Sequence, residues 1–268
     1  MWYAPSSPIS RLQPTYTDLV HRWLYDQAGI LHGDLSPSNI MCRTVEGKVH
    51  GVLTDYDLSL WTALDQARPG TPKQRTGTPP FMANGLLNGD DSLHLYRHDV
   101  ESFFYVMLIL ATHYEIQAPK GKGGGVRMRK GKHHFQRWFD MPNYDTLAAA
   151  KSSYFRTNFE IPEVAPSFKD FYGWLLELQM SFACGFLVRR PQLLPLKGGG
   201  FLKIEGQACC CGGGTSVFDE ETLGGHITYS TIVEPTRHLT GELEGLIIRY
   251  NPPPSSPSKS TGTAQACA

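Results

Sequence analysis

The first segment with a clear hydrophobic period lies between residues 17 and 27. Its apolar positions recur at helical spacing and are Leu19, Val20, Trp23 and Leu24. Because spacings of three and four residues place side chains on one helix face, this segment predicts an amphipathic helix, which Gly29 ends. Residues 1–16 before it are rich in Pro and Ser, and they predict an irregular segment.

Two further patterns predict the centre of the fold. The apolar-rich runs 40–43 and 49–53 flank Glu46-Gly47-Lys48, which predicts a β-hairpin. From Asp99 to about His113 the sequence predicts a helix that is apolar on nearly all sides, as is typical of a helix buried inside a domain. Shorter apolar segments predict further helices at residues 135–139, 146–155 and 168–182.

The hydrophobic pattern weakens in two places. Residues 119–134 are basic and glycine-rich without interleaved aromatic residues, and they favour a solvated loop over a nucleic-acid site. From residue 189 onward, runs of Gly and Cys and a Pro/Ser-rich end lack any helical or strand period. We therefore expect residues 189–268 to form a disordered tail, within which residues 218–232 could pack as a short patch.

The composition limits the partners and the cellular location that we expect for the protein. Lys and Arg number 25, as do Asp and Glu, so no net charge favours nucleic acid or an anionic membrane. The six Cys form no disulfide framework, and the start of the chain lacks the features of a signal peptide. The longest apolar run, residues 103–111, is far shorter than the roughly 20 residues of a membrane span. We expect an intracellular protein, cytoplasmic or nuclear.

The candidate chemical residues are Asp34, Asn39 and Asp55. The first two lie in H-G-D-L-S-P-S-N (32–39), and Asp55 follows the predicted hairpin. Pro37 excludes a continuous helix, so Asp34 and Asn39 share a tight loop, towards which the hairpin returns Asp55. One carboxylate can take a proton from an acceptor hydroxyl, while an amide oxygen and a second carboxylate can hold Mg²⁺. Magnesium-dependent phosphoryl transfer requires these parts.

Four sequence blocks, in the expected order, resemble those of protein kinases. H-G-D-L-S-P-S-N is similar to the catalytic loop, and D-Y-D (55–57) to the magnesium-binding D-F-G. R-T-G-T-P-P-F-M-A (75–83) resembles the end of an activation segment, and Y-R-H-D-V-E-S-F-F-Y-V-M (96–107) the buried helix after it. The residues in these blocks are most similar to those of the fungal-type protein kinases. The resemblance covers roughly the first two thirds of the chain.

The resemblance implies a fold, cofactors and an acceptor. The fold is the large C-terminal lobe of a kinase over residues 17–188, an α+β and mainly α-helical unit with a small β-hairpin. The cofactors are ATP and Mg²⁺, and the acceptor is a Ser/Thr hydroxyl of a protein substrate.

The resemblance also implies a role for each site residue. Asp34 is the catalytic base, Asn39 and Asp55 hold magnesium and nucleotide, and Thr78 docks the substrate through a hydrogen bond to the acid. Structural support comes from His32, Tyr56 and Asp99. Of these, Asp99 is expected to accept hydrogen bonds from backbone amides of the catalytic loop.

Several departures from the kinase pattern bear on activity. Gly33 replaces the Arg that pairs with a phosphate on the activation segment. Ser36 replaces the Lys that neutralises the transferring phosphate. Asp57 replaces the Gly of D-F-G. Asn84-Gly85 replaces the Pro-Glu of A-P-E, which removes a carboxylate that fixes the segment through an Arg.

The residues before Asp34 depart furthest from a complete kinase. They contain no Lys and no Gly-x-Gly, so we expect this chain to represent the large lobe alone and to transfer phosphate poorly by itself. One alternative is a small-molecule phosphotransferase of the aminoglycoside or choline kinase type, which shares H-G-D-L-x-P-x-N but not the peptide-docking loop 77–83. Another is a non-catalytic pseudokinase that serves as an interaction module. We expect neither a nucleic-acid nor a membrane partner.

Overall fold

The fold is organised around α4 (Tyr96–His113), which is buried at every position except Leu110. The computed structural model describes residues 14–45, 48–62, 77–89, 93–120, 123–131, 133–157, 160–189, 192–196, 200–204 and 218–233. In this part of the chain the fold is α+β and mainly helical. The prediction of a central helix that ends at His113 is confirmed, although the helix begins three residues before Asp99.

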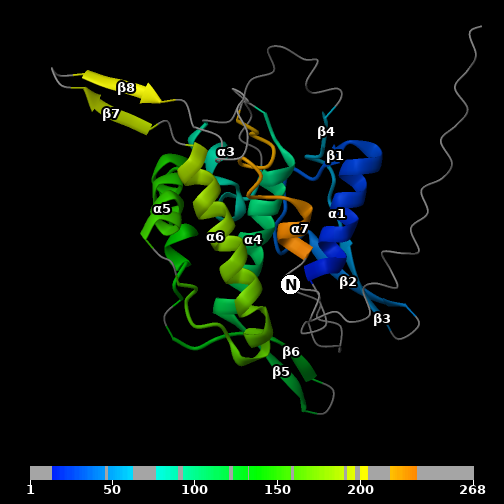
Figure 1. Cartoon of the computed structure of the whole chain (residues 1–268). Helices are drawn as coiled ribbons and strands as arrows, with labels where there is room; N and C mark the ends of the chain where they lie inside the picture. Colours follow the sequence, from blue (N-terminus) through cyan, green and yellow to red (C-terminus); the bar gives the residue numbers. More distant parts are fainter. Residues whose placement is uncertain are drawn as a thin grey trace, which may run out of the picture.

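The other helices surround α4. They are α1 (Pro14–Ala28), α3 (Asn84–Asn88), α5 (Tyr144–Thr157), α6 (Tyr172–Arg189) and α7 (Tyr229–Val233), with 3₁₀ turns at Pro79–Phe81, Gln136–Trp138 and Pro166–Phe171. Figure 1 shows α6 beside α4, with α5 on the outer side of both. Trp174 of α6 packs edge-on against Phe103 of α4, with ring centroids 6.1 Å apart. The predicted helix at 146–155 is confirmed with longer bounds. The one predicted at 168–182 begins four residues later and runs to Arg189, and residues 135–139 contain only the 3₁₀ turn Gln136–Trp138.

All strands in the described residues form two-stranded antiparallel pairs. They are β1 (Ile30–Leu31) with β4 (Leu60–Trp61), β2 (Ile40–Val45) with β3 (Lys48–Leu53), β5 (Tyr114–Lys120) with β6 (Gly123–Met128), and β7 (Gln192–Leu196) with β8 (Gly200–Ile204). The β2–β3 hairpin is the one that the sequence predicts. Its register pairs Ile40 with Leu53, so β3 ends beside the start of β2 and next to the loop 32–39.

The basic segment 119–134 is not the loop that the sequence favours. Half of it, residues 119–120 and 123–128, belongs to the β5–β6 hairpin, in which Tyr114 pairs with Met128 and Ile116 with Val126. The hairpin extends from the end of α4 and projects from the helical body (Figure 1). Residues with strand preference near its base, among them Tyr114, Ile116 and Val126, outweigh the glycines at 123–125.

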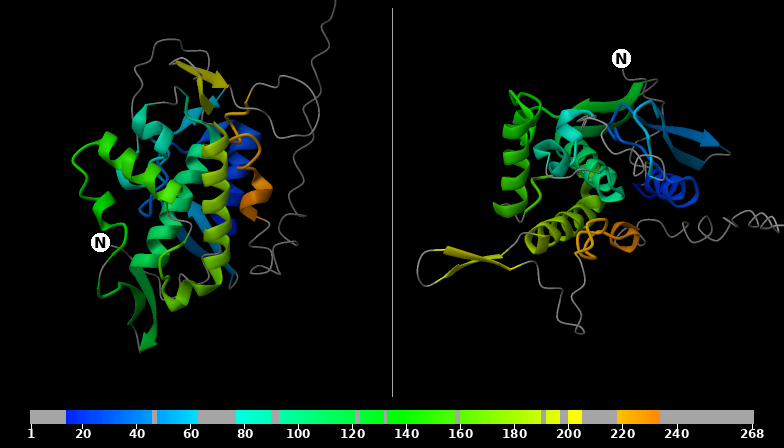
Figure 2. Two further views of the ribbon diagram at one scale, coloured as in Figure 1. Left: turned by 60° about the vertical axis from the view of Figure 1, so that its left-hand side comes forward. Right: turned by 90° about the horizontal axis from the view of Figure 1, so that it is seen from above.

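The short patch that the sequence suggests at residues 218–232 packs against the domain, whereas β7 and β8 place two other parts of the expected disordered tail in strands. Leu223, Ile227 and Ile232 are buried in the core, and the Trp174 indole N–H donates a 2.8 Å hydrogen bond to the Ile232 carbonyl. Gly185 of α6 permits this contact, because a Cβ there would lie 2.7 Å from the Leu223 Cβ. Figure 2 shows this segment (orange) against α6. Residues 205–217 and 234–268 of the expected tail lie outside the described residues.

One described stretch, Pro166–Arg189, is long and apolar enough to cross a membrane by length and composition alone. A core helix passes the same test. Here Leu175, Leu178 and Phe182 belong to the hydrophobic core, as a helix packed on one face of a domain requires.

Candidate active site

The loop between β1 and β2 has a backbone that only glycine adopts without strain at residue 33. Gly33 has a φ of 80°, and a Cβ at this position would collide with the Leu58 carbonyl oxygen. Gly33 therefore lets residues 57–58 pack against the loop directly. The local backbone geometry therefore excludes the Arg that kinases carry at this position.

Asp34 and Thr78 are joined across 44 positions of sequence. The Thr78 backbone N–H and its hydroxyl each donate a 2.8 Å hydrogen bond to the same carboxylate oxygen, Asp34 Oδ1. Gly77 has a φ of 123° and its Cβ position lies 3.0 Å from the Met82 side chain, so this turn also suits glycine. The contact that the sequence predicts between Thr78 and the acid is present, and Asp34 Oδ2 has no partner among the described residues.

Asn39 is fixed by both its side chain and its backbone. Its amide Nδ2 donates a 2.9 Å hydrogen bond to the Asp34 carbonyl, and its own carbonyl accepts from the Thr54 N–H (3.0 Å) and hydroxyl (3.3 Å). The side chain is buried. With Nδ2 engaged, the Asn39 Oδ1 atom is the free end of the amide and accepts no hydrogen bond within the described part of the chain.

Asp55 follows Thr54 at the end of β3. It has a φ of 63°, an uncommon value for a residue with a side chain, and its carboxylate is exposed. Thr54 is bonded to Asn39, so the hairpin returns Asp55 to the loop that carries Asn39 and Asp34. Strained backbone of this kind is frequent at functional sites.

Asn39 and Asp55 fit a magnesium ion. Each presents a side-chain oxygen without a protein partner in the described residues, and Mg²⁺ prefers one or two such ligands together with water and phosphate oxygens. The described residues contain no group of three or more His, Cys, Asp or Glu that could hold a metal alone. Asn39 and Asp55 therefore each offer an oxygen of the kind that Mg²⁺ prefers, but not a complete coordination shell.

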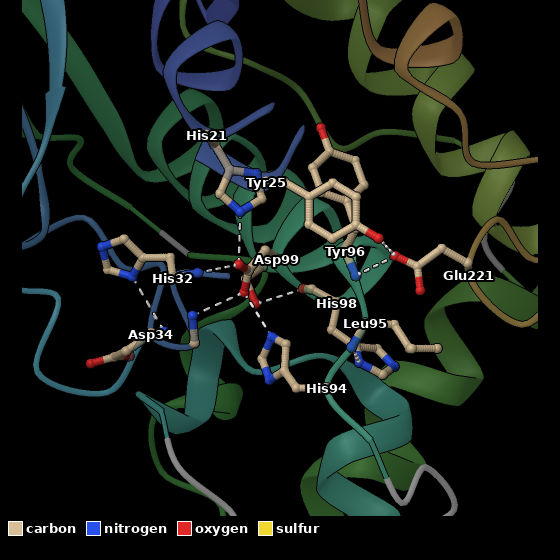
Figure 3. A network of polar contacts seen from close by, with 12 residues as sticks. His21, Tyr25, His32, Asp34, His94, Leu95, Tyr96, His98, Asp99 and Glu221 are labelled. Carbon is tan, nitrogen blue, oxygen red and sulfur yellow. Dashed lines mark hydrogen bonds and ion pairs between the residues drawn. The ribbon is translucent and has the colours of Figure 1, made fainter. Parts of the chain in front are cut away.

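Asp99 holds the start of the loop from beneath. Its Oδ2 accepts the His32 N–H at 2.7 Å, and its Oδ1 accepts the Gly33 N–H at 3.2 Å. Two histidines contact the same carboxylate, His21 Nε2 at Oδ2 (2.7 Å) and His94 Nε2 at Oδ1 (2.8 Å) (Figure 3). The amide contacts match the expectation from the resemblance.

The sequence analysis did not predict the contacts of these two histidines with Asp99. A signal for His21 exists, because it lies among Leu19, Val20 and Trp23 in the predicted amphipathic helix, and a buried polar side chain needs a partner. His94 gives no such signal, since it precedes the helix in an irregular stretch.

Asp99 is an ionised carboxylate in the folded protein. Complete burial acts to raise its pKa, but the interactions with His94 and His21 outweigh burial and bring the pKa well below the ordinary value. A charged acceptor makes stronger hydrogen bonds to backbone N–H groups than a neutral one. Asp99 thus fixes the backbone at His32 and Gly33.

His32 connects the loop to the β2–β3 hairpin. Its Nδ1 accepts the Asp34 N–H at 3.3 Å, so Nε2 carries the proton and donates to the Thr54 carbonyl at 3.0 Å. Burial lowers the pKa of His32, which favours this neutral form. Its ring contacts Tyr56 with centroids 4.8 Å apart and planes tilted by 49°, so the expected pairing of the two rings is present but is not parallel.

The sequence of this region matches a known family. Residues 19–111 match the model of the fungal protein kinase family, and no curated protein matches the chain. The matched segment includes every site residue described above, from His21 to Asp99. Residues 19–111, less than half of the chain, are therefore similar to part of a fungal protein kinase domain.

Proposed function

We propose that this chain is the large lobe of a protein kinase that transfers the γ-phosphate of ATP, with Mg²⁺, to a Ser or Thr hydroxyl of a protein. One observation carries the proposal: Thr78 is held on Asp34 by two hydrogen bonds, which places residues 77–83 beside the acid. An acid at an acceptor site needs a neighbouring surface that positions the acceptor, because positioning supplies much of the catalysis in phosphoryl transfer.

Asp34 has the geometry of a base that orients the acceptor. Both hydrogen bonds from Thr78 end on Oδ1, so the carboxylate cannot rotate freely and Oδ2 is available to an incoming hydroxyl. The Asn39 amide fixes the Asp34 backbone at the same time. In this proposal Oδ2 accepts the acceptor hydroxyl and takes its proton as the phosphoryl group is transferred.

Asn39 and Asp55 are the proposed ligands of magnesium. The bound ion would neutralise charge on the phosphate oxygens. The Asn39 Nδ2 contact directs Oδ1 away from the Asp34 carbonyl, and the exposed Asp55 carboxylate can reach solvent-side ligands. Neither side chain has to break a protein hydrogen bond in the described residues to bind.

A non-catalytic kinase-like module is the second candidate, and Ser36 favours it. Ser36 is buried and its hydroxyl contacts the Ser38 hydroxyl at 2.7 Å, so no cation takes the position that a Lys holds in Ser/Thr kinases. Loss of that charge would slow transfer. A small-molecule phosphotransferase is less well supported, because its acid would not need the loop that Thr78 carries.

Labelled phosphate transfer tests the proposal. The purified chain would be incubated with γ-labelled ATP, Mg²⁺ and a library of Ser, Thr and Tyr peptides, beside choline and an aminoglycoside. We expect slow transfer to Ser/Thr peptides that falls by about 10²-fold or more in Asp34→Asn. Asp57→Asn, at an exposed neighbouring acid, should retain the rate.

Other outcomes would overturn the proposal in distinct ways. Transfer to choline or the aminoglycoside alone would establish a small-molecule phosphotransferase. Magnesium-dependent nucleotide binding without transfer to any acceptor would establish the non-catalytic module. Transfer that is equal in Asp34→Asn would remove Asp34 from its assigned role.

A further inference from the structure

Three buried ionisable residues lie behind the loop that carries Thr78. Glu101 and Tyr105 are one helical turn apart on α4, and Lys151 is on α5; all are fully buried. Lys and Glu are rarely fully buried unless they have partners. The groups that these three side chains contact therefore indicate what the cluster does.

The Lys151 ammonium is directed at the backbone of the loop. Its Nζ donates to the Met82 carbonyl at 2.6 Å and lies 3.4 Å from the Pro79 carbonyl. The Tyr105 ring faces Nζ with its centroid 4.0 Å away, a cation–π distance. Burial lowers the pKa of Lys151, and the nearby Glu101 carboxylate opposes that effect.

Glu101 holds the other end of the same segment. Its Oε1 accepts the Asn84 N–H at 2.8 Å and the Tyr105 hydroxyl at 2.6 Å. The Asn84 N–H is at the start of α3, where helix amides lack partners within the helix. Lys151 and Glu101 thus bind the backbone at residues 79–84 from both ends.

The composition of residues 77–89 explains why Lys151 and Glu101 bind backbone groups of this segment and not its side chains. Residues 77–89 contain no Asp, Glu, Lys or Arg, so the segment itself cannot form an ion pair through a side chain. Asn84 and Gly85 occupy the place where the kinase pattern has an acid. The charged groups come from α4 and α5 instead, and they meet carbonyl and N–H groups.

A short chain of hydrogen bonds joins this cluster to the acid. Lys151 binds the Met82 carbonyl, the Met82 N–H donates to the Thr78 carbonyl at 3.1 Å, and Thr78 donates twice to Asp34. Movement of residue 82 would therefore move Thr78.

We propose that Lys151 and Glu101 are positioning residues, which hold residues 79–84 so that Thr78 stays on Asp34. They take the structural place of the acid that Asn84-Gly85 lacks. The consequence for peptide phosphorylation rests on the proposed function, whereas the positioning itself does not.

Amide hydrogen exchange tests the positioning directly. We expect Lys151→Met to speed exchange at the Thr78 and Met82 amides by about tenfold or more, because the loop loses the hydrogen bond to the Met82 carbonyl. The His32 and Gly33 amides, which Asp99 holds, should keep their protection. The matched control is Lys169→Met, at an exposed lysine, which should leave all these rates unchanged.

Thermal unfolding separates positioning from general stability. Methionine fills the space of the lysine stem and removes the cost of burying an ammonium group, so Lys151→Met should retain or raise the melting temperature. Loss of protection that is uniform over the lobe, together with a lower melting temperature, would show a purely structural role. Unchanged exchange at Thr78 would equally overturn the proposal.

Glu101 offers an independent pair of variants. Glu101→Gln keeps an oxygen that can accept from the Asn84 N–H and the Tyr105 hydroxyl, so protection of the Asn84 amide should persist. Glu101→Leu removes that oxygen, and exchange at Asn84 should rise by about tenfold, the factor for one buried hydrogen bond. Equal exchange in the two variants would contradict the assignment.

The catalytic consequence is measured separately. If the chain phosphorylates peptides, Lys151→Met should raise the peptide KM or lower peptide kcat/KM while the KM for ATP stays constant. A changed ATP KM with an unchanged peptide KM would overturn the catalytic part of the proposal. Absence of all transfer would count against the proposed function alone, because the exchange result stands without it.

Discussion

Gly33 illustrates how one residue determines what the loop can and cannot contain. Its positive φ and the nearby Leu58 carbonyl exclude a side chain, so the absence of the kinase Arg here follows from the backbone. The types of Asp34, Asn39 and Asp55 and their spacing predicted the candidate chemistry. The φ of Asp55 and the histidine pair on Asp99 could not be predicted, because both depend on contacts between distant segments.

We expect Gly33→Ala to lower the free energy of unfolding by about 1–3 kcal/mol, because it adds backbone strain and a clash with Leu58. Gly131→Ala is the control: its φ is 121°, but nothing lies within 4 Å of the added Cβ. Chemical denaturation of both variants separates clash from strain. Equal losses at the two positions would contradict a role for the Leu58 contact.

Asp99 should make stability depend on acid pH. Because its folded-state pKa lies below the unfolded value of about 4, the unfolded chain binds the proton first as the pH falls. The stabilisation is therefore complete above about pH 4 and is lost as the pH falls through the folded-state pKa.

Asp99→Asn should cost about 3 kcal/mol at neutral pH, where hydrogen bonds to a charged acceptor are lost. The variant should also show a flatter decline of stability below about pH 4 than the parent chain. Unfolding free energies measured from pH 3 to 7 would check both effects. An Asp99→Asn curve parallel to that of the parent chain would refute the assignment.

At the scale of elements, the hydrophobic period predicted those helices and strands that depend mainly on their own local sequence. The α4 helix and the β2–β3 hairpin have the type and position that their sequences predict, because each is defined by its own residues and turn. The β5–β6 hairpin was missed because glycine and basic residues obscure its period. Its base is fixed by a non-local contact, in which the Arg129 N–H donates to the His113 carbonyl at 2.8 Å.

His113 at the end of α4 gives a pH-dependent prediction for this junction. Its Nε2 accepts the Phe135 N–H at 3.3 Å, and burial, aided by His133 and His134, lowers its pKa to about 4. The unfolded value is about 6.5, so the unfolded chain binds more protons between these two values. Stability should therefore rise with pH from about 4 to 6.5.

The His113→Asn variant should lose much of that slope. His226→Asn, at a histidine that is only partly buried, is the control and should keep it. Thermal unfolding across pH 4 to 7 provides the measurement. A slope that survives in His113→Asn would assign the pH dependence to another group.

At the scale of the whole molecule, a segment late in the chain supports the helix that carries Asp99. Glu221 accepts the Tyr25 hydroxyl at 2.8 Å and the Tyr96 N–H at 3.0 Å, and it thereby links α1 to the start of α4 (Figure 3). Tyr96, the first residue of the helix that carries Asp99, is therefore hydrogen-bonded to an acid 125 positions later in the chain. Local sequence could not predict this, because neither partner lies near Glu221 in the chain.

Glu221→Ala should lower the free energy of unfolding by about 1–2 kcal/mol, since it leaves the Tyr96 N–H and the Tyr25 hydroxyl without this acceptor. Glu221→Gln keeps the oxygen and should lose less than half as much. Denaturant titration of the pair is the check. Equal stability of Glu221→Ala and the parent chain would show that the segment does not support α4.

The central claim is that Thr78 on Asp34 forms an acceptor site for a peptide hydroxyl. Its most direct test is the initial rate of magnesium-dependent phosphate transfer to a Ser/Thr peptide, measured for the parent chain, Thr78→Ser and Thr78→Val. Serine keeps the hydroxyl that donates to Asp34, whereas valine keeps only the backbone N–H. We predict that Thr78→Ser retains peptide kcat/KM and that Thr78→Val loses about tenfold or more. Equal rates for Thr78→Val and the parent chain would contradict the account.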